Sequence, residues 1–291
     1  MSHHERVIEA ADGVSLHVEQ WDAEGEPKFV VVLSHGAAEH VGRYAHMAER
    51  WNANGGIVIG ADHRGQGKSG GSKGHVDHFE TFARDLRTVI EASVESLPES
   101  SRPDKLPWFV FGHSMGGLIA LVYLLDHERA VPLAGAMISA PLIEPRVKVG
   151  ALKRFAANVA MTIAPKFAQP TGIPVAHISR DPAAVAAYAA DTRRVDVLSA
   201  GWLRAMEAAS TRVSAEVGSI QLPMLWYAGT GDEICDHKAT QRLHASLTDA
   251  EAREQTYREF KGYFHELHNE PAIEREVILK MLDTWIETRR G

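Results

Sequence analysis

Five short segments of the sequence are apolar at almost every position. A strand with one solvent-exposed face alternates apolar and polar residues. Uninterrupted apolar runs therefore indicate strands that are buried on both faces of a sheet. The runs are FVVVLSHG (29–36), GIVIGAD (56–62), WFVFGHS (108–114), LAGAMISAP (133–141) and PMLWYAG (223–229). Residues 256–260 are expected to add a last strand, and residues 6–21 alternate around an Ala-Asp-Gly turn that predicts an antiparallel hairpin.

Segments with helical spacing separate these predicted strands. They cover residues 43–54, 79–97, 115–126, 237–247 and 271–288. A regular alternation of strands and helices is typical of a mostly parallel sheet with helices on both faces. The pattern therefore predicts an α/β fold of the doubly wound kind.

The alternation breaks between residues 146 and 218. This segment has no strand-like run, is rich in alanine and contains four prolines. Asp181 followed by Pro182 is typical of a helix start. We expect residues 146–218 to form a helical cap, or lid, inserted after the fourth parallel strand of a core domain made of residues 1–145 and 219–291.

Composition narrows the functional classes. The chain has 291 residues, of which 45% are hydrophobic, enough for one large domain with an insertion. The net charge of -7 gives no reason to expect nucleic-acid binding. The single cysteine, Cys235, excludes an internal disulfide framework. With neither a signal-peptide pattern nor an apolar run of roughly 20 residues, we expect a cytoplasmic protein.

The predicted cap differs in charge from the rest of the chain. It holds ten Lys and Arg residues and five Asp and Glu residues, whereas the whole chain is acidic. One predicted helical face carries Leu152, Phe155, Val159 and Ile163. This face either covers the cap's own pocket, with the charges solvated, or forms a basic amphipathic surface for peripheral contact with a membrane or micelle.

A possible nucleophile lies between the third predicted strand and the helix that follows it. Gly112, Ser114 and Gly116 fit the pattern G-x-S-x-G. The motif is short, but a strand before it and a helix after it are the context of a nucleophile elbow. Small neighbours permit the tight turn that exposes the hydroxyl. We predict that Ser114 is the nucleophile.

A serine hydroxyl needs a base to take its proton and an acid to orient that base. Asp232 follows the strand at 223–229 and so lies at the carboxyl edge of the sheet; Asp236 is the alternative, one turn further on. Among sixteen histidines, His265 lies in the loop before the final helix, where this architecture has its base. His265 and His268 lack a metal-binding spacing, so we expect no metal and no cofactor.

The transition state also needs two hydrogen-bond donors for its oxyanion. One is expected to be the N–H of Met115, directly after the nucleophile. The other is expected to be the N–H of Ala37 in the loop SHGAAEH after the first parallel strand.

Together these segments resemble the monoacylglycerol lipase family of α/β-hydrolases, including its bacterial and lysophospholipase-like members. The matching segments are HGAAEHVGRY (35–44), ADHRGQGKSGG (61–71), GHSMGG (112–117), SAP (139–141), AGTGDEICD (228–236) and HELHNE (265–270). The resemblance implies an α/β-hydrolase fold with a Ser114–Asp232–His265 triad and oxyanion donors at Ala37 and Met115.

The resemblance further implies a glycerol pocket lined by Glu39, Arg43 and His268. Carboxylate, guanidinium and imidazole groups offer acceptors and donors to vicinal hydroxyls. Glu39 and Arg43 could equally form an ion pair that shapes the oxyanion loop. Two positions depart from the family pattern: Ala38 stands where glycine is frequent, and Thr192 where proline is common.

The expected reaction is hydrolysis of monoacylglycerols to fatty acid and glycerol through an acyl-enzyme, with the cap supplying an apolar channel. Other interpretations stay open at this point: a lysophospholipase, a broad-specificity carboxylesterase, an acyltransferase, or a non-catalytic ligand receptor. The last is disfavoured because all three triad residues are present.

Overall fold

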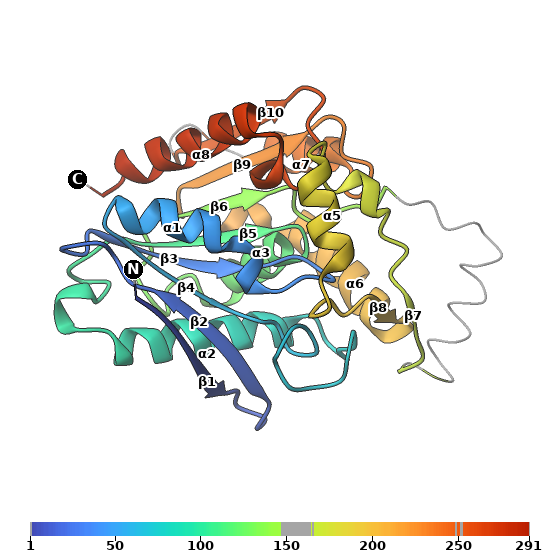
Figure 1. The fold of residues 1–291 in the computed structure, drawn as a ribbon, viewed down its shortest axis with the longest axis horizontal. Coiled ribbons are helices and arrows are strands. Elements are labelled where there is room, and N and C mark those ends of the chain that lie inside the picture. Colours follow the sequence, from blue (N-terminus) through green and yellow to red (C-terminus); the bar gives the residue numbers. More distant parts are fainter. Residues whose placement is uncertain (1, 147–163, 165, 248, 251–252, 291) are drawn as a thin grey trace.

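An eight-stranded sheet forms the centre of the molecule in the computed structural model, which describes all residues except 1, 147–163, 165, 248, 251–252 and 291 (Figure 1). The strand order is β1-β2-β4-β3-β5-β6-β9-β10. The strands are β1 (His3–Glu9), β2 (Ser15–Trp21), β3 (Phe29–Ser34), β4 (Gly56–Ala61), β5 (Trp108–His113), β6 (Gly135–Ser139), β9 (Met224–Gly229) and β10 (Gln255–Phe260). Strands β3 to β6, β9 and β10 are parallel, and the predicted hairpin β1–β2 joins antiparallel to β4.

The helices cover both faces of this sheet, as the sequence predicted. They include α1 (Ala45–Ala53), α2 (Glu80–Ser96), α3 (Met115–His127), α7 (His237–Ala245) and α8 (Ala272–Glu287). Every residue of β3, β5, β6 and β9 is buried, which explains why these strands show no alternation. Val32 and Val110 pack in one core with α2, α3 and α7, whereas Val31 and Phe109 pack in a second core with α1 and α8.

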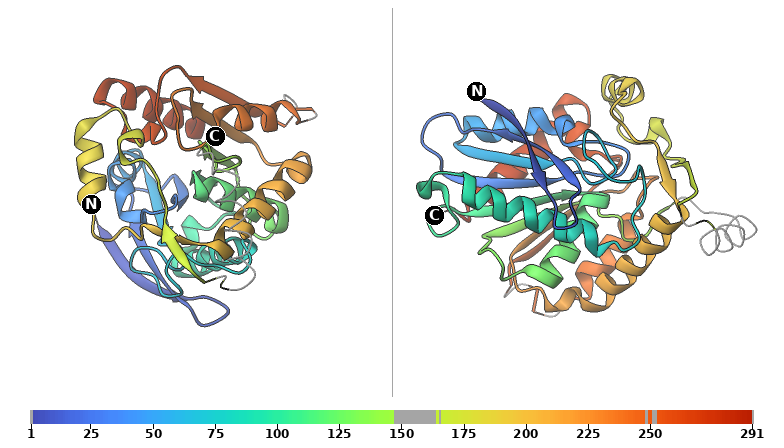
Figure 2. Two further views of the ribbon diagram at one scale, coloured as in Figure 1. Left: turned by 90° about the vertical axis from the view of Figure 1, so that its right-hand side faces the viewer. Right: turned by 90° about the horizontal axis from the view of Figure 1, so that it is seen from below.

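The segment between β6 and β9 holds α5 (Pro182–Ala190) and α6 (Ala200–Glu216). It lies beside the carboxyl ends of the parallel strands, on the right of Figure 1, and the left view of Figure 2 faces it. The predicted helix start is confirmed, because the Asp181 side chain accepts a hydrogen bond from the Ala183 N–H at 2.9 Å. Helix α6 packs on α3 and contributes buried residues to the core that contains Val32 and Val110.

The expectation that residues 146–218 contain no strand is wrong. Strands β7 (Ala168–Pro170) and β8 (Val197–Ser199) pair antiparallel in a separate two-stranded sheet. Three residues are too few to display a hydrophobic period, so the sequence pattern missed them. The apolar face predicted at Leu152, Phe155, Val159 and Ile163 lies outside the described residues.

Most of the described basic residues in this segment form ion pairs with carboxylates. The pairs are Arg146–Glu233, Arg180–Glu270, Arg193–Glu19, Arg194–Asp196 and Arg212–Asp126. These contacts favour a structural role for the charges over a free basic surface in the part of the segment that the structure describes. Among all the residues that the structure describes, no helix is both long and apolar enough to cross a bilayer.

Helix α8 offers a direct test of the second core. We expect Ile278→Ala to lower the free energy of unfolding by about 2–5 kcal/mol, because this fully buried side chain would leave a cavity. Ile273 lies on the same helix and is 82% exposed, so Ile273→Ala should change stability by less than about 0.5 kcal/mol. Urea unfolding of both variants measures the difference, and equal effects would contradict the packing described here.

Candidate active site

Ser114 occupies the sharp turn between β5 and α3. Its backbone has φ 53° and ψ -119°, a strained conformation for a residue with a side chain. A Cβ atom at Gly116 would lie 2.0 Å from the Ser34 carbonyl oxygen, and one at Gly112 would lie 2.5 Å from the Gly116 carbonyl oxygen. The turn therefore needs small residues at both positions, as the G-x-S-x-G motif predicted.

The structure brings Asp232 and His265 together. The Nδ1 atom of His265 lies 2.7 Å from Asp232 Oδ2. The other carboxylate oxygen accepts hydrogen bonds from the N–H groups of Ile234 at 2.7 Å and Cys235 at 2.9 Å. With its carboxylate fixed in this way, Asp232 orients the imidazole so that Nε2 is free to act as the base.

Asp236, the alternative acid, has a different role. Its side chain accepts a hydrogen bond from the Lys238 N–H at 3.0 Å and caps the start of α7. It makes no hydrogen bond to His265, so the geometry favours Asp232 as the proposed acid.

Ser114 and His265 line one cavity beneath the segment between β6 and β9. The two side chains are not hydrogen-bonded to each other in this structure. Among the described residues, the only hydrogen-bond contact of the Ser114 hydroxyl is with Cys235 Sγ, at 4.0 Å. The His265 ring packs 4.7 Å from the ring of His113, next to the nucleophile in the chain. A side-chain movement is therefore needed before proton transfer, and such contacts often tighten only with substrate.

Two groups near the nucleophile have shifted proton affinities. Burial opposes a charge on His265, but the charge and hydrogen bond of Asp232, with smaller effects from Glu266 and Glu39, raise its pKa above 6.5. Burial, followed by the charge of Asp232, raises the pKa of the Cys235 thiol well above 9.0. Cys235 thus stays a neutral, buried thiol and does not compete with Ser114.

The two N–H groups predicted to bind the oxyanion donate no hydrogen bond to the described residues. Neither Ala37 nor Met115 donates a backbone hydrogen bond within the described part of the chain, whereas the N–H of Gly36 donates to the Glu39 carboxylate. A Cβ at Gly36 would lie 3.2 Å from Ser114 Cβ, so this loop runs directly beside the nucleophile. The geometry thus selects Ala37 rather than Gly36 as the available donor.

Ala38 takes a left-handed conformation, with φ 56°. Glycine adopts this conformation at lower cost, which is consistent with the glycine that the resemblance led us to expect at this position. The Ala38 carbonyl accepts a hydrogen bond from Arg194 Nε at 3.1 Å. A residue from the segment between β6 and β9 therefore helps to hold the oxyanion loop.

A buried ion cluster connects the oxyanion loop with the loop of the base. Arg43 donates to Glu39 at 2.7 Å and to both carboxylate oxygens of Glu266 at 2.6 and 2.7 Å. Burial opposes ionisation of both acids; it raises the pKa of Glu39, while the guanidinium lowers the pKa of Glu266 to about 2. Glu39 and Glu266 line the cavity and Arg43 does not, so the guanidinium acts by positioning the two carboxylates.

His268 does not lie where the resemblance placed it. Its side chain is fully buried, packs 4.9 Å from the rings of Tyr44 and His113, and does not line the cavity. Burial lowers its pKa to about 3. The short 3₁₀ helix Leu267–Asn269 turns the imidazole into the core, so in this structure it contacts no substrate space.

The cavity is small and is lined by both polar and apolar residues. Its lining comprises Gly36, Ala37, Glu39, His113, Ser114, Ile173, Ile178, Tyr188, Ile234, His265 and Glu266. The sequence analysis missed Glu266 and the apolar residues. A carboxylate directly after the proposed base was the one visible signal for Glu266, whereas nothing in the pattern singled out the isoleucines.

Helix α5 is tied to the oxyanion loop by several contacts. The guanidinium groups of Arg43 and Arg194 both stack on the Tyr188 ring, 4.6 and 3.7 Å from its centroid. His40 Nε2 lies 2.6 Å from Asp191 Oδ2. The turn after α5 therefore forms with Thr192 in place of the proline expected from the family pattern.

A serine on a strand–helix turn, a buried carboxylate–imidazole pair and two free N–H donors, carried on a mostly parallel eight-stranded sheet, define an α/β-hydrolase of the serine hydrolase class. Comparison with known proteins supports this class. Residues 25–272 match the family model described as serine aminopeptidase, S33, and the chain belongs to this family.

Relatives confirm the resemblance seen in the sequence. The monoacylglycerol lipase of Mycolicibacterium smegmatis is 34% identical over 281 residues, covering 94% of this chain and 93% of that protein. Phospholipase YtpA of Bacillus subtilis is 29% identical over 263 residues, covering 89% and 95%. The crystal structure of Paleococcus ferrophilus monoacylglycerol lipase has a TM-score of 0.81 at 28% identity, covering 94% and 99%.

The assignment of the acid is testable with a matched pair of variants. Asp232→Asn should lower kcat for a p-nitrophenyl ester by about 10⁴-fold, because the imidazole loses its orienting charge and its correct tautomer. Asp236→Asn should leave kcat near the wild-type value. Steady-state kinetics measures both, and a larger loss in the Asp236 variant would contradict the assignment.

The raised pKa of His265 predicts the acidic limb of the pH–rate profile. The base must be neutral, so kcat/KM should fall as pH drops through a value above 6.5. Glu266→Gln removes a charge that raises this pKa, and its limb should move to lower pH. Glu144→Gln, an exposed acid paired with Arg242, is the control and should leave the limb in place. A Glu266 variant with an unmoved limb would rule out this electrostatic effect.

Proposed function

We propose that this chain hydrolyses the ester bond of monoacylglycerols, releasing a fatty acid and glycerol. The observation that carries the proposal is the mixed lining of the cavity, which combines a nucleophile and two carboxylates with three isoleucines. The monoacylglycerol lipases among the relatives support this substrate class.

The reaction proceeds through an acyl-enzyme. Ser114 attacks the ester carbonyl carbon while His265 takes the hydroxyl proton, and the N–H groups of Ala37 and Met115 bind the oxyanion. The C–O bond to glycerol then breaks, and His265 returns the proton to the departing glycerol oxygen. Water next attacks the acyl carbon with His265 again as base, and the acyl–serine bond breaks as Ser114 recovers its proton.

We infer that residues 146–218 act as a lid that supplies apolar residues to the lining of the cavity. Ile173, Ile178 and Tyr188 support this role, because all three line the cavity and come from this segment. Each methylene group of an acyl chain buried there would contribute about 0.8 kcal/mol. Preference for chain length should therefore depend on this segment.

Glycerol fits the polar residues of the lining better than a phosphate-bearing head group does. Glu39 and Glu266 face the cavity, and the one guanidinium between them is already held by both. An anionic phosphate would meet like charge there, whereas hydroxyl groups can donate to carboxylate oxygens. The phospholipase among the relatives keeps lysophospholipid hydrolysis as the second candidate.

The remaining candidates differ in their products. A broad-specificity carboxylesterase would cleave simple esters of the same acid as well as monoacylglycerol, and an acyltransferase would pass the acyl group to added glycerol. A receptor without activity would not need a base held by a buried acid. We also expect a cytoplasmic protein; peripheral contact with lipid stays a prediction, checked by vesicle binding at low and high salt.

The head-group argument predicts a substrate order. The value of kcat/KM for a monoacylglycerol should exceed that for lysophosphatidylglycerol, whose head group is a net anion, with the same acyl chain by at least about 10-fold, equivalent to roughly 1.4 kcal/mol. Chromatographic assay of released fatty acid measures both rates, with Ser114→Ala as the inactive blank. A preference for the lysophospholipid would favour the second candidate, and an active Ser114→Ala variant would contradict the whole mechanism.

A further inference from the structure

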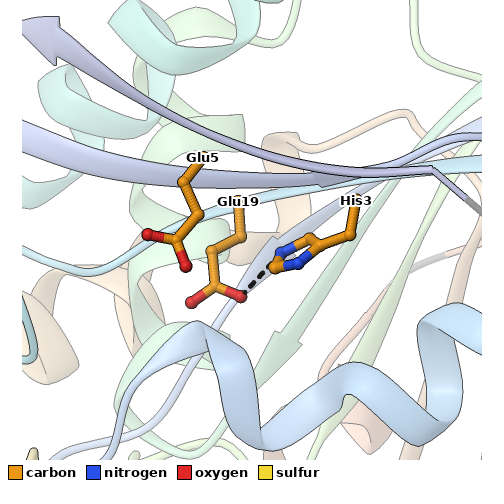
Figure 3. Close-up of side chains that lie close together, drawn as sticks. All are labelled: His3, Glu5 and Glu19. Atoms are coloured by element: carbon orange, nitrogen blue, oxygen red, sulfur yellow. Dashed lines mark hydrogen bonds and ion pairs between the residues drawn. The ribbon is translucent and has the colours of Figure 1, made fainter.

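Strands β1 and β2 place two carboxylates directly opposite each other. In their antiparallel register, Glu5 pairs with Glu19, and Figure 3 shows His3 beside these two carboxylates. His17 is two residues from Glu19 along β2, so the alternation of the strand puts it on the same face. Like charges directly opposite each other destabilise a hairpin. This face of the hairpin therefore favours a cation.

The donor atoms on this face have the spacing of a metal site. His3 Nε2 lies 3.1 Å from Glu19 Oε2, and His17 Nε2 lies 3.5 Å from Glu19 Oε1 and 3.7 Å from Glu5 Oε2. Ligands at 2.0–2.1 Å from a tetrahedral zinc ion are roughly 3.3 Å apart. These three separations are close to that value, and the ligand atoms of His3, Glu5 and Glu19 all lie within 4.8 Å of one another. His17 would join this group from its place beside the two carboxylates.

Two of these atoms have no hydrogen-bond partner among the described residues. They are His17 Nε2 and Glu19 Oε1, which face each other without hydrogen-bond geometry. Their side chains are only 8% and 4% exposed. A buried polar atom without a partner is costly, and each such atom calls for an explanation. A bound ion would satisfy both atoms at once.

We propose that His3, Glu5, His17 and Glu19 form a zinc-binding site. Imidazole with carboxylate suits Zn²⁺, whereas Ca²⁺ and Mg²⁺ prefer oxygen ligands alone. The present counter-charges are weaker partners: Lys68 reaches Glu5 at 2.7 Å from an exposed position, and Arg193 is 3.7 Å from Glu19. The ion would displace Lys68 and fasten β1 to β2.

The site is separate from catalysis, since none of its four ligands lines the cavity around Ser114. It does border the loop that follows the oxyanion donor. A Cβ atom at Gly42 would lie 3.1 Å from Glu19 Oε1 and 3.0 Å from the Arg193 guanidinium. Zinc is thus expected to act on stability rather than on chemistry.

The test uses the full chain after removal of metal with a chelator. Calorimetric titration with ZnCl₂ should show one ion per chain with Kd at or below about 1 μM, and Co²⁺ should give the visible absorption of a tetrahedral site. Saturating Zn²⁺ should also raise the melting temperature. Mg²⁺ and Ca²⁺ should give neither signal.

Variants at exposed positions separate the site from general histidine binding. His3→Ala and Glu5→Gln should each weaken zinc binding at least 10-fold and leave the circular dichroism spectrum unchanged. His4→Ala is the matched control, because His4 is the next residue on the strand and pairs with Asp22 at 2.7 Å. Absence of one-to-one binding, or equal losses in the His3 and His4 variants, would overturn the proposal.

Discussion

One buried guanidinium holds together the two loops on which the site depends. Arg43 joins Glu39, which fixes the backbone beside the oxyanion donor, to Glu266, which directly follows the proposed base. Removing one member of such a buried cluster leaves a charge without compensation, at a cost of about 3–5 kcal/mol. The position of the donor and the position of the base are therefore not independent features of this molecule.

The core of the fold could be predicted because its physical signals are strong. Strands buried on both faces leave continuous apolar runs, and α3 follows the nucleophile without a break. Asp232 could be selected over Asp236 from its place just after β9. Strands β7 and β8 could not be predicted, because three residues at the edge of a small sheet carry no period and one of them is Pro170.

The parts of the site that escaped prediction depend on tertiary geometry. His268 has the spacing of a pocket residue, but a single 3₁₀ turn directs its ring into the core. The role of Glu266 depends on Arg43, which lies more than two hundred residues away in the chain. The proposed zinc ligands lack a recognisable metal motif because the register of two strands, rather than spacing along one helix, brings them together.

The contacts between α5 and the oxyanion loop have a consequence for turnover. Any outward movement of α5 would unstack Tyr188 from Arg43 and separate Asp191 from His40, and would also loosen the support of the Ala38 carbonyl. If a long, flexible ester enters by outward movement of α5, the open conformation would lack part of the support for the oxyanion loop, and only the closed conformation would stabilise the tetrahedral intermediate fully. Loading and chemistry would then alternate in time, with closure over the acyl chain completing the machinery that cleaves it.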